Sequence, residues 1–270
     1  MENNLKNISD DQKRRIWYNN LAVKFEIVKA LRHKELMIIR DDCRIRWLNV
    51  QHVKIWDSVR SHLYVENRPA SLYMSLDYYK MIPLMSFNLG IRAKQYDEWA
   101  EKIKENMTGQ DFGLDLDNKK GSWVDVIPDN KKLRDLFNSF GVRFANWMSG
   151  SHGFHFIIPF DDMPDEVKTL DYPHLIAFYK SMAALIKKGI KTVDDTIYMA
   201  TRVFKCPYTI EKHGRVIWPL DNKDFEALAW DELILDPIFL LNKRRIKNRG
   251  IYLQGSPEGI KKFIKEWEGF

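Results

Sequence analysis

The sequence has few cysteines and no long apolar run. Its only cysteines, Cys43 and Cys206, cannot form a four-cysteine zinc site or a disulfide framework. No apolar stretch approaches the roughly 20 residues that a membrane-spanning helix needs, and no signal-peptide pattern opens the chain. We therefore expect a soluble cytoplasmic protein with reduced, packed cysteines and no membrane partner.

The chain is mildly basic and rich enough in apolar residues to build a large core. Lys and Arg number 43 against 37 acidic residues, a net charge of +6, and 45% of the 270 residues are hydrophobic. This charge is compatible with a polyanionic partner but does not require one. Positive charge is densest in residues 241–249, which form either a solvated face or a contact with phosphates. Its basic residues are Lys243, Arg244, Arg245, Lys247 and Arg249.

Residues 112–117, Phe-Gly-Leu-Asp-Leu-Asp, have the period-2 alternation of a half-buried strand. Asp115 and Asp117 fall on the same face, roughly 6.5–7 Å apart. Two adjacent carboxylates repel each other, so unless they are solvated they need a proton or a cation. Hard divalent cations such as Mg²⁺ prefer oxygen ligands and often hold substrate phosphates as well. A strand end with two solvated aspartates is the alternative interpretation.

Other patterns predict the elements around this strand. A capping box at residues 9–12 predicts a helix that continues toward Ala30. We expect strands at 35–39, 43–50 and 69–75, and a strand from Ala200 that Pro207 ends. Helices are expected at 95–107, from Asp129, at 172–188 and after Ser256, which caps a helix with Pro257 in its first position.

Two further stretches carry chemistry. Residues 146–158 predict a strand, a small polar turn and a second strand. Such a turn exposes backbone N–H groups to a phosphate, although a simple hairpin with a surface histidine fits too. Downstream, Asp194 and Asp195 precede a strand with Arg202 and Lys205, of which regular alternation would turn only one toward a site.

The order of these three stretches resembles the archaeo-eukaryotic primase superfamily, most closely the catalytic small subunit of DNA primase. The resemblance covers about residues 25–220. Its first motif, Asp-X-Asp, matches Asp115 and Asp117. The second, Ser-Gly-X-X-Gly-X-His, and the third, an Asp followed by a basic residue two before a proline, match Ser149, Gly150, Gly153, His155, Asp194, Lys205 and Pro207, with Asp195 as the alternative acidic residue. An upstream family arginine that reaches the nucleotide corresponds to Arg46.

The chain also departs from that family. The small subunit usually carries a zinc knuckle between its first two motifs, but residues 118–148 contain no Cys or His, so we expect no zinc. Ser151 and His152 stand where the second motif usually has basic residues. A family histidine after the third motif corresponds to Glu211 by direct count, or to His213 if the turn is longer. Smaller plasmid, viral, CRISPR-associated and end-joining polymerases of the superfamily therefore stay open.

The resemblance implies an α/β (α+β) primase fold, in which an RRM-like mixed sheet is flanked by helices and an N-terminal αβ unit. It implies one catalytic domain over residues 1–270, with an αβ unit to about 110, a motif-bearing core at 111–220 and a helical part at 221–270. The expected activity is DNA-directed primer synthesis from NTPs or dNTPs on single-stranded DNA, at the nucleoid or a replication site. An end-joining or gap-filling polymerase and a non-catalytic single-strand-binding module are the alternatives.

The resemblance also implies the roles of the site residues. Two Mg²⁺ or Mn²⁺ ions would be held by Asp115, Asp117 and Asp194. The β- and γ-phosphates would lie against Ser149, Gly150, Ser151, His152, Gly153, His155 and Lys205, with Arg46 and His213 as further nucleotide contacts. A large primase subunit, a helicase or other replication or repair proteins are the expected protein partners.

Overall fold

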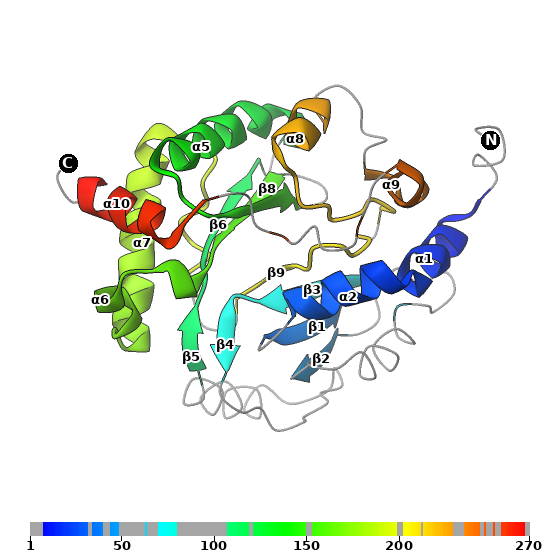
Figure 1. The fold of residues 1–270 in the computed structure, drawn as a ribbon, viewed down its shortest axis with the longest axis horizontal. Coiled ribbons are helices and arrows are strands. Elements are labelled where there is room, and N and C mark those ends of the chain that lie inside the picture. Colours follow the sequence, from blue (N-terminus) through cyan, green and yellow to red (C-terminus); the bar gives the residue numbers. More distant parts are fainter. Residues whose placement is uncertain are drawn as a thin grey trace.

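The computed structural model (Figure 1) describes residues 8–31, 34–39, 44–48, 63, 70–79, 107–118, 121–149, 153–198, 202–211, 213–228, 235–243, 246, 251 and 255–267. Within these ranges the strands form three antiparallel sheets of four, two and three strands. In that same part of the chain, no helix is both long and apolar enough to span a membrane.

The strands are short. They are β1 (Glu35–Ile39), β2 (Arg44–Leu48), β3 (Ser71–Ser75), β4 (Asp77–Tyr79), β5 (Met107–Gln110), β6 (Phe112–Asp117), β7 (Ala145–Met148), β8 (Gly153–Ile158) and β9 (Val203–Lys205). The helices are α1 (Asp10–Asn19), α2 (Leu21–Ala30), α5 (Ile127–Phe140), α6 (Asp165–Lys168), α7 (Tyr172–Gly189), α8 (Asn222–Leu228), α9 (Pro237–Lys243) and α10 (Pro257–Trp267).

Most of the predicted elements that fall on described residues are present, with two differences. The helix expected to run to Ala30 is broken at Asn20, whose extended backbone ends α1. Its side chain accepts hydrogen bonds from the backbone N–H groups of Ala22 and Val23 and so begins α2. The helix expected at 95–107 lies outside the described residues except for Met107, which begins β5.

The N-terminal sheet, with strand order β2-β1-β3-β9, is completed by a strand from far along the chain. β9 pairs antiparallel with β3, matching Tyr73 with Lys205 and Met74 with Phe204. β9 belongs to the expected core in sequence but pairs with a strand of the expected N-terminal unit. The predicted division of the chain into three parts stays a prediction.

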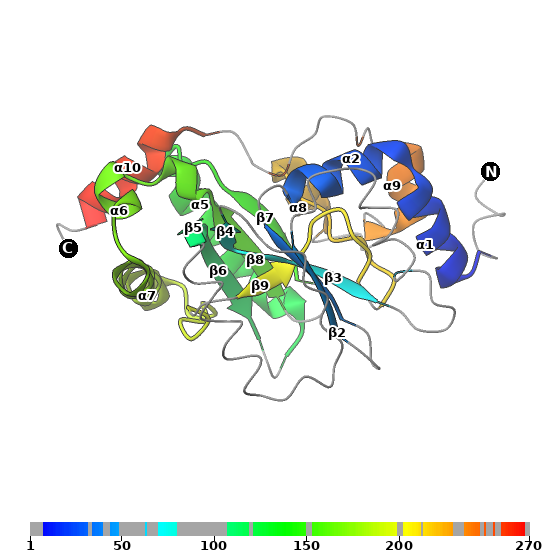
Figure 2. The same ribbon diagram turned by 90° about the horizontal axis from the view of Figure 1, so that it is seen from below.

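The motif sheet, with order β6-β8-β7, buries one face under helices. The Phe156 ring of β8 meets Phe137 of α5 at 6.0 Å between centroids, and the Phe112 ring of β6 meets Tyr179 of α7 at 5.1 Å. In two views, α5, α7 and α10 lie on the opposite side of the molecule from α1 and α2 (Figures 1 and 2). The carboxylates of β6 alternate with this buried set and therefore belong to the other face.

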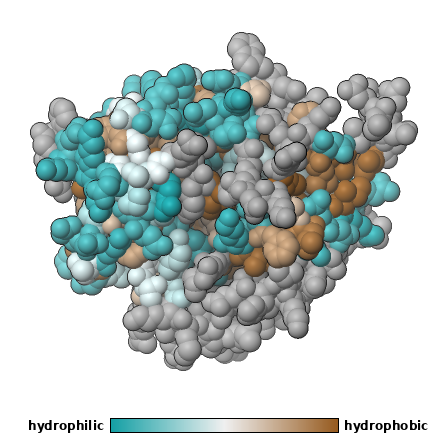
Figure 3. Space-filling view, viewed as in Figure 1, coloured by the Kyte–Doolittle hydropathy of each residue, from teal (hydrophilic) through white to brown (hydrophobic). Residues whose placement is uncertain are grey.

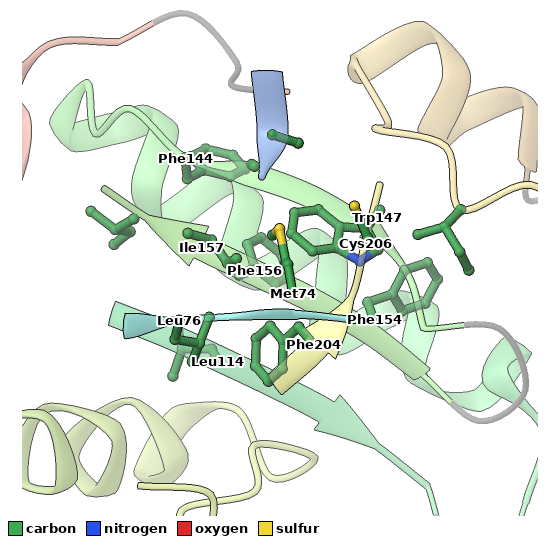
Figure 4. Close-up of a cluster of buried hydrophobic side chains, with 14 of the residues drawn as sticks. Met74, Leu76, Leu114, Phe144, Trp147, Phe154, Phe156, Ile157, Phe204 and Cys206 are labelled. Atoms are coloured by element: carbon green, nitrogen blue, oxygen red, sulfur yellow. The ribbon is translucent and has the colours of Figure 1, made fainter. Parts of the chain in front are cut away.

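That other face approaches the N-terminal sheet closely. A Cβ atom on Gly113 would lie 2.6 Å from Leu76 Cδ1 and 2.9 Å from Phe204 Cε2. Figure 4 shows Met74, Leu76 and Phe204 among the buried side chains of the motif sheet. Gly113 thus lets side chains of the two sheets interlock beside the carboxylates.

The exposed apolar side chains of the described residues include a group on α1 and α2. Ile16 is 45%, Leu21 60% and Phe25 52% exposed. Figure 3 shows hydrophobic surface over these two helices and a mostly hydrophilic surface over α5.

The hairpin between β7 and β8 explains one glycine of the second motif. Ser149 N–H donates to the Gly153 carbonyl at 2.8 Å and closes the hairpin. Gly153 lies opposite Asp117 in the register, where a Cβ atom would come 1.6 Å from the Leu116 carbonyl oxygen. Strand packing therefore requires glycine at position 153, whatever the turn binds.

We predict that Gly153→Ala lowers the free energy of unfolding by about 2–4 kcal/mol, because backbone atoms of β6 would have to move. Urea denaturation measures this loss. Gly189→Ala is the matched control, since a Cβ atom there meets nothing within 4 Å. Equal stability of the two variants would show that β6 and β8 are not packed so closely.

Candidate active site

Asp115 and Asp117 lie on β6 as its alternation predicts. Both are partly exposed, whereas Leu114 and Leu116 are fully buried. The register sets Asp115 opposite His155 and Asp117 opposite Gly153 on β8. The first two sequence motifs are therefore neighbours across one strand pair.

The structure also brings Asp194 to β6. The segment 192–194 runs antiparallel to it: Asp117 N–H donates to the Thr192 carbonyl at 3.0 Å, and Asp194 N–H donates to the Asp115 carbonyl at 2.8 Å. Leu116 and Val193 form a bridge between these two bonds. Asp194, which is distant in the sequence, thus lies on a segment that adjoins the strand carrying Asp115 and Asp117.

Asp194 and Asp195 have different partners. Asp194 Oδ1 accepts hydrogen bonds from Thr196 N–H at 2.9 Å and Thr196 Oγ1 at 2.6 Å. Asp195 instead pairs with Lys187 of α7 at 2.5 Å, and this hydrogen bond lowers the pKa of its carboxyl. Since Asp195 is engaged with α7, the geometry favours Asp194 as the third acidic residue of the site.

Two side chains hold the segment around Asp194 in place. Asp129, near the start of α5, accepts hydrogen bonds through Oδ2 from Thr192 N–H at 3.1 Å and Thr192 Oγ1 at 3.0 Å. The buried Tyr198 donates its hydroxyl to the Gly113 carbonyl at 2.8 Å. These contacts fix the segment to β6 and α5 on both sides of Asp194.

His155 is buried rather than a surface residue. It is 7% exposed, and its ring stacks on Phe204 of β9 with centroids 4.1 Å apart. Its Nε2 lies 3.6 Å from Asp115 Oδ1. Burial, followed by the charges of Lys205 and Arg202, lowers the pKa of His155 well below its usual value, so the imidazole is neutral at neutral pH.

Arg202 was not assigned to the site from the sequence. Its Nη2 lies 3.7 Å from Asp115 Oδ2. β9 begins only at Val203, so strand alternation does not govern Arg202. The charges of both Arg202 and Lys205 lower the pKa of His155, and the expectation that only one of the two side chains faces the site stays a prediction. The sequence signal that could have identified Arg202 was its place as a second basic residue, beside Lys205, near the third motif.

The remaining candidates are less fully described. Gly150, Ser151, His152, Arg244, Arg245, Lys247 and Arg249 lie outside the described residues, and Lys243 and Arg46 are described by their backbone alone. The register matches Arg46 with Met37, Met37 with Tyr73, and Tyr73 with Lys205, so these four lie in one row of the N-terminal sheet.

The two counterparts of the family histidine differ in burial. Glu211 is 1% exposed, and Arg14 of α1 donates to its backbone carbonyl. His213 is exposed, in the turn between the paired residues Ile210 and Val216. A Cβ atom on the adjacent Gly214 would lie 3.6 Å from the Asp10 carboxylate of α1. This turn therefore packs against the start of α1.

The acidic residues suit a hard divalent cation without enclosing one. Asp117 Oδ1 is buried and has no hydrogen-bond partner among the described residues, which is costly for a carboxylate oxygen unless a cation approaches it. Oxygen donors of this kind are the ligands that Mg²⁺ prefers. Within the described ranges, however, no three His, Cys, Asp or Glu side chains already form a metal-holding group.

Comparison with known proteins identifies the fold. No protein-family model matches the sequence, and no curated protein matches it. The polymerase domain of Ligase D from Mycobacterium tuberculosis, solved in complex with DNA, matches with a TM-score of 0.59 and 10% identity, over 89% of this chain and 90% of that one. The chain thus has a mixed α/β fold similar to that of this polymerase domain. The match does not single out the primase small subunit.

We predict that Asp129→Ala lowers the free energy of unfolding by about 1–2 kcal/mol, since Thr192 loses the acceptor of two hydrogen bonds. It should also speed hydrogen exchange at the Asp194 amide, measured by NMR. Asp135→Ala, on the same helix with an exposed Lys131 partner, should change stability by less than about 0.5 kcal/mol. Unchanged exchange at Asp194 in the first variant would remove Asp129 from the support of the site.

Proposed function

We propose that the protein is a template-dependent nucleotidyltransferase of the primase-polymerase type. It would add nucleotides from NTPs or dNTPs to a nucleic-acid strand paired with a single-stranded DNA template. The observation that carries the proposal is the meeting of Asp115, Asp117 and Asp194 on adjoining strand segments, in a chain with the fold of a polymerase domain. A solvated strand end would need none of these partners.

The acidic residues would hold the ions of the reaction. Asp115, Asp117 and Asp194 fit Mg²⁺ or Mn²⁺ as oxygen donors, and the unpartnered Asp117 Oδ1 supports this assignment. Bound in a pair, such ions supply activation of a 3′-hydroxyl and compensation of charge at the α-phosphate. The protein's own part is to hold the three aspartates on adjoining strand segments, which the strand pairing and Asp129 support.

The opposite side of the site would bind the triphosphate. Lys205 and Arg202 bring positive charge near His155, and preorganised charge of this sign stabilises a phosphoryl-transfer transition state. A neutral His155 can donate one hydrogen bond to a phosphate oxygen. Ser149, the turn from Gly150 to Gly153, Arg46 and His213 are the further nucleotide contacts that the motif resemblance implies.

The template would be bound through the basic segment of residues 241–249. The related polymerase domain was solved with DNA, which supports DNA as the partner here. We assign Lys243, Arg244, Arg245, Lys247 and Arg249 to phosphate contacts on the template, in a single catalytic domain formed by the whole chain. Salt-dependent template binding that weakens when this segment is neutralised would test the assignment.

A gap-filling or end-joining polymerase is the second candidate. The matching domain belongs to a ligase, and a polymerase beside a ligase would fill DNA ends before they are joined. An unprimed single strand and a gapped duplex with a 5′-phosphate, each with labelled NTPs and dNTPs and with Mg²⁺ or Mn²⁺, separate the two roles. A non-catalytic binding module would incorporate nucleotide on neither substrate and bind no triphosphate in a metal-dependent way.

We predict that Asp115→Asn and Asp117→Asn each reduce nucleotide incorporation about a thousandfold, because the several kcal/mol of charge stabilisation supplied by bound ions is lost. Primer-extension assays measure the loss, and circular dichroism checks the fold. Asp195→Asn is the matched control, since Asp195 pairs with Lys187 instead, and it should keep activity within a few-fold. Wild-type extension by a double Asp115→Asn, Asp117→Asn variant would end the proposal.

We predict that His155→Ala weakens triphosphate binding about tenfold, the value of roughly one lost hydrogen bond to a charged group. Binding of a single-stranded template should change less than twofold. Separate fluorescence titrations with the two ligands measure this. His174→Ala removes an exposed histidine paired with Asp171 and should change neither affinity. Equal losses for triphosphate and template in His155→Ala would make His155 a structural residue.

A further inference from the structure

The Asp115 carboxylate has a basic side chain near each of its oxygens. His155 Nε2 lies 3.6 Å from Oδ1, and Arg202 Nη2 lies 3.7 Å from Oδ2. The Asp115 side chain is only 16% exposed, so water compensates its charge poorly. The arginine therefore supplies nearby positive charge to a carboxylate that the proposed function gives to a metal ion.

Arg202 approaches Asp115 without being firmly bound to it. A separation of 3.7 Å exceeds the usual length of a charged hydrogen bond. The Arg202 Nε is buried with no hydrogen-bond partner in the described part of the chain, while the side chain is 34% exposed. Its guanidinium can thus move away from Asp115 toward solvent and gain hydrogen bonds by doing so.

His155 lacks that freedom. Its ring is stacked between fixed neighbours, with Phe204 at 4.1 Å and the edge of Trp147 at 5.9 Å between centroids. Asn146 of β7 also donates to its backbone carbonyl at 3.1 Å. Of His155 and Arg202, Arg202 is the one that can leave Asp115 when another cation arrives.

We propose that Arg202 is the resident counter-ion of Asp115 and competes with a divalent metal ion for this carboxylate. The inference rests on the proposed function, because it takes Asp115 as an ion ligand. Binding of the ion would release the guanidinium, whose planar set of donors suits a phosphate group. Both metal binding and triphosphate binding would then draw Arg202 away from Asp115. Each would therefore increase the affinity for the other, because such coupling is reciprocal.

Binding of Mn²⁺ alone, followed by the electron paramagnetic resonance signal of the free ion, tests the competition without any catalytic readout. Arg202→Gln should bind Mn²⁺ about fivefold more tightly than the wild type, the size expected for loss of a partly exposed ion pair. Arg202→Lys, which keeps the charge, should bind within about twofold of the wild type. Arg143→Gln removes an arginine that pairs with Asp162 elsewhere and should leave Mn²⁺ affinity unchanged.

A thermal measurement guards against a folding defect. Saturating Mn²⁺ should raise the melting temperature of Arg202→Gln more than that of the wild type, because the ion replaces the missing positive charge. Asp115→Asn serves as the reference for a lost ligand and should weaken Mn²⁺ binding in either background.

The outcomes separate this inference from the proposed function. If Asp115→Asn weakens Mn²⁺ binding but Arg202→Gln binds the ion as the wild type does, or more weakly, the competition is wrong and the metal site stands. If neither the wild type nor Arg202→Gln binds Mn²⁺, or if Asp115→Asn binds it unchanged, both the competition and the assignment of Asp115 as a ligand are overturned.

Discussion

Two backbone hydrogen bonds between β6 and residues 192–194 are the constraint on which the site depends. They join Asp117 to Thr192 and Asp194 to Asp115. A shift of this pairing by one residue would turn each side chain to the opposite face and exchange Asp194 for Asp195. Asp129 and Tyr198 hold the same pairing from outside it, so the position of Asp194 is determined by the scaffold rather than by a ligand.

This pairing concentrates negative charge beside a region of positive charge. Asp115 lies between His155 and Arg202, while Lys205 and Arg202 both act on the pKa of His155. Because Gly113 has no side chain, Phe204 can approach β6 closely, and the His155 ring stacks on Phe204. Arg202 and Lys205, at and just before β9, thus contribute positive charge, while β6 and residues 192–194 contribute the carboxylates.

Local patterns predicted much of this arrangement. Alternation placed Asp115 and Asp117 on one face of a strand, the residues of the second motif predicted the β7–β8 hairpin, and Pro257 begins the last helix as expected. These features depend on neighbours in the sequence, so periodicity and capping rules reach them.

Features that depend on distant contacts could not be predicted in this way. The pairing of β9 with β3 and the burial of His155 against Phe204 follow from how the two sheets meet. The approach of Arg202 to Asp115 joins residues far apart in the sequence, and Arg202 lies just before β9, where strand alternation does not apply. Gly153 fitted a phosphate-binding turn by sequence, yet its contact with Leu116 alone requires glycine there. The residues on both sides of Asn20 favour a helix, so a single helix was predicted. The side-chain cap of Asn20, which begins α2, interrupts that stretch.

A crystal structure of the protein with Mn²⁺ and a non-hydrolysable nucleoside triphosphate would test the central claim most directly. The account predicts anomalous density for Mn²⁺ within roughly 2 Å of the Asp115 and Asp117 carboxylate oxygens, with Asp194 turned toward it and the triphosphate on the side of His155 and Lys205. Ordered triphosphate with Mn²⁺ away from all three aspartates would contradict it.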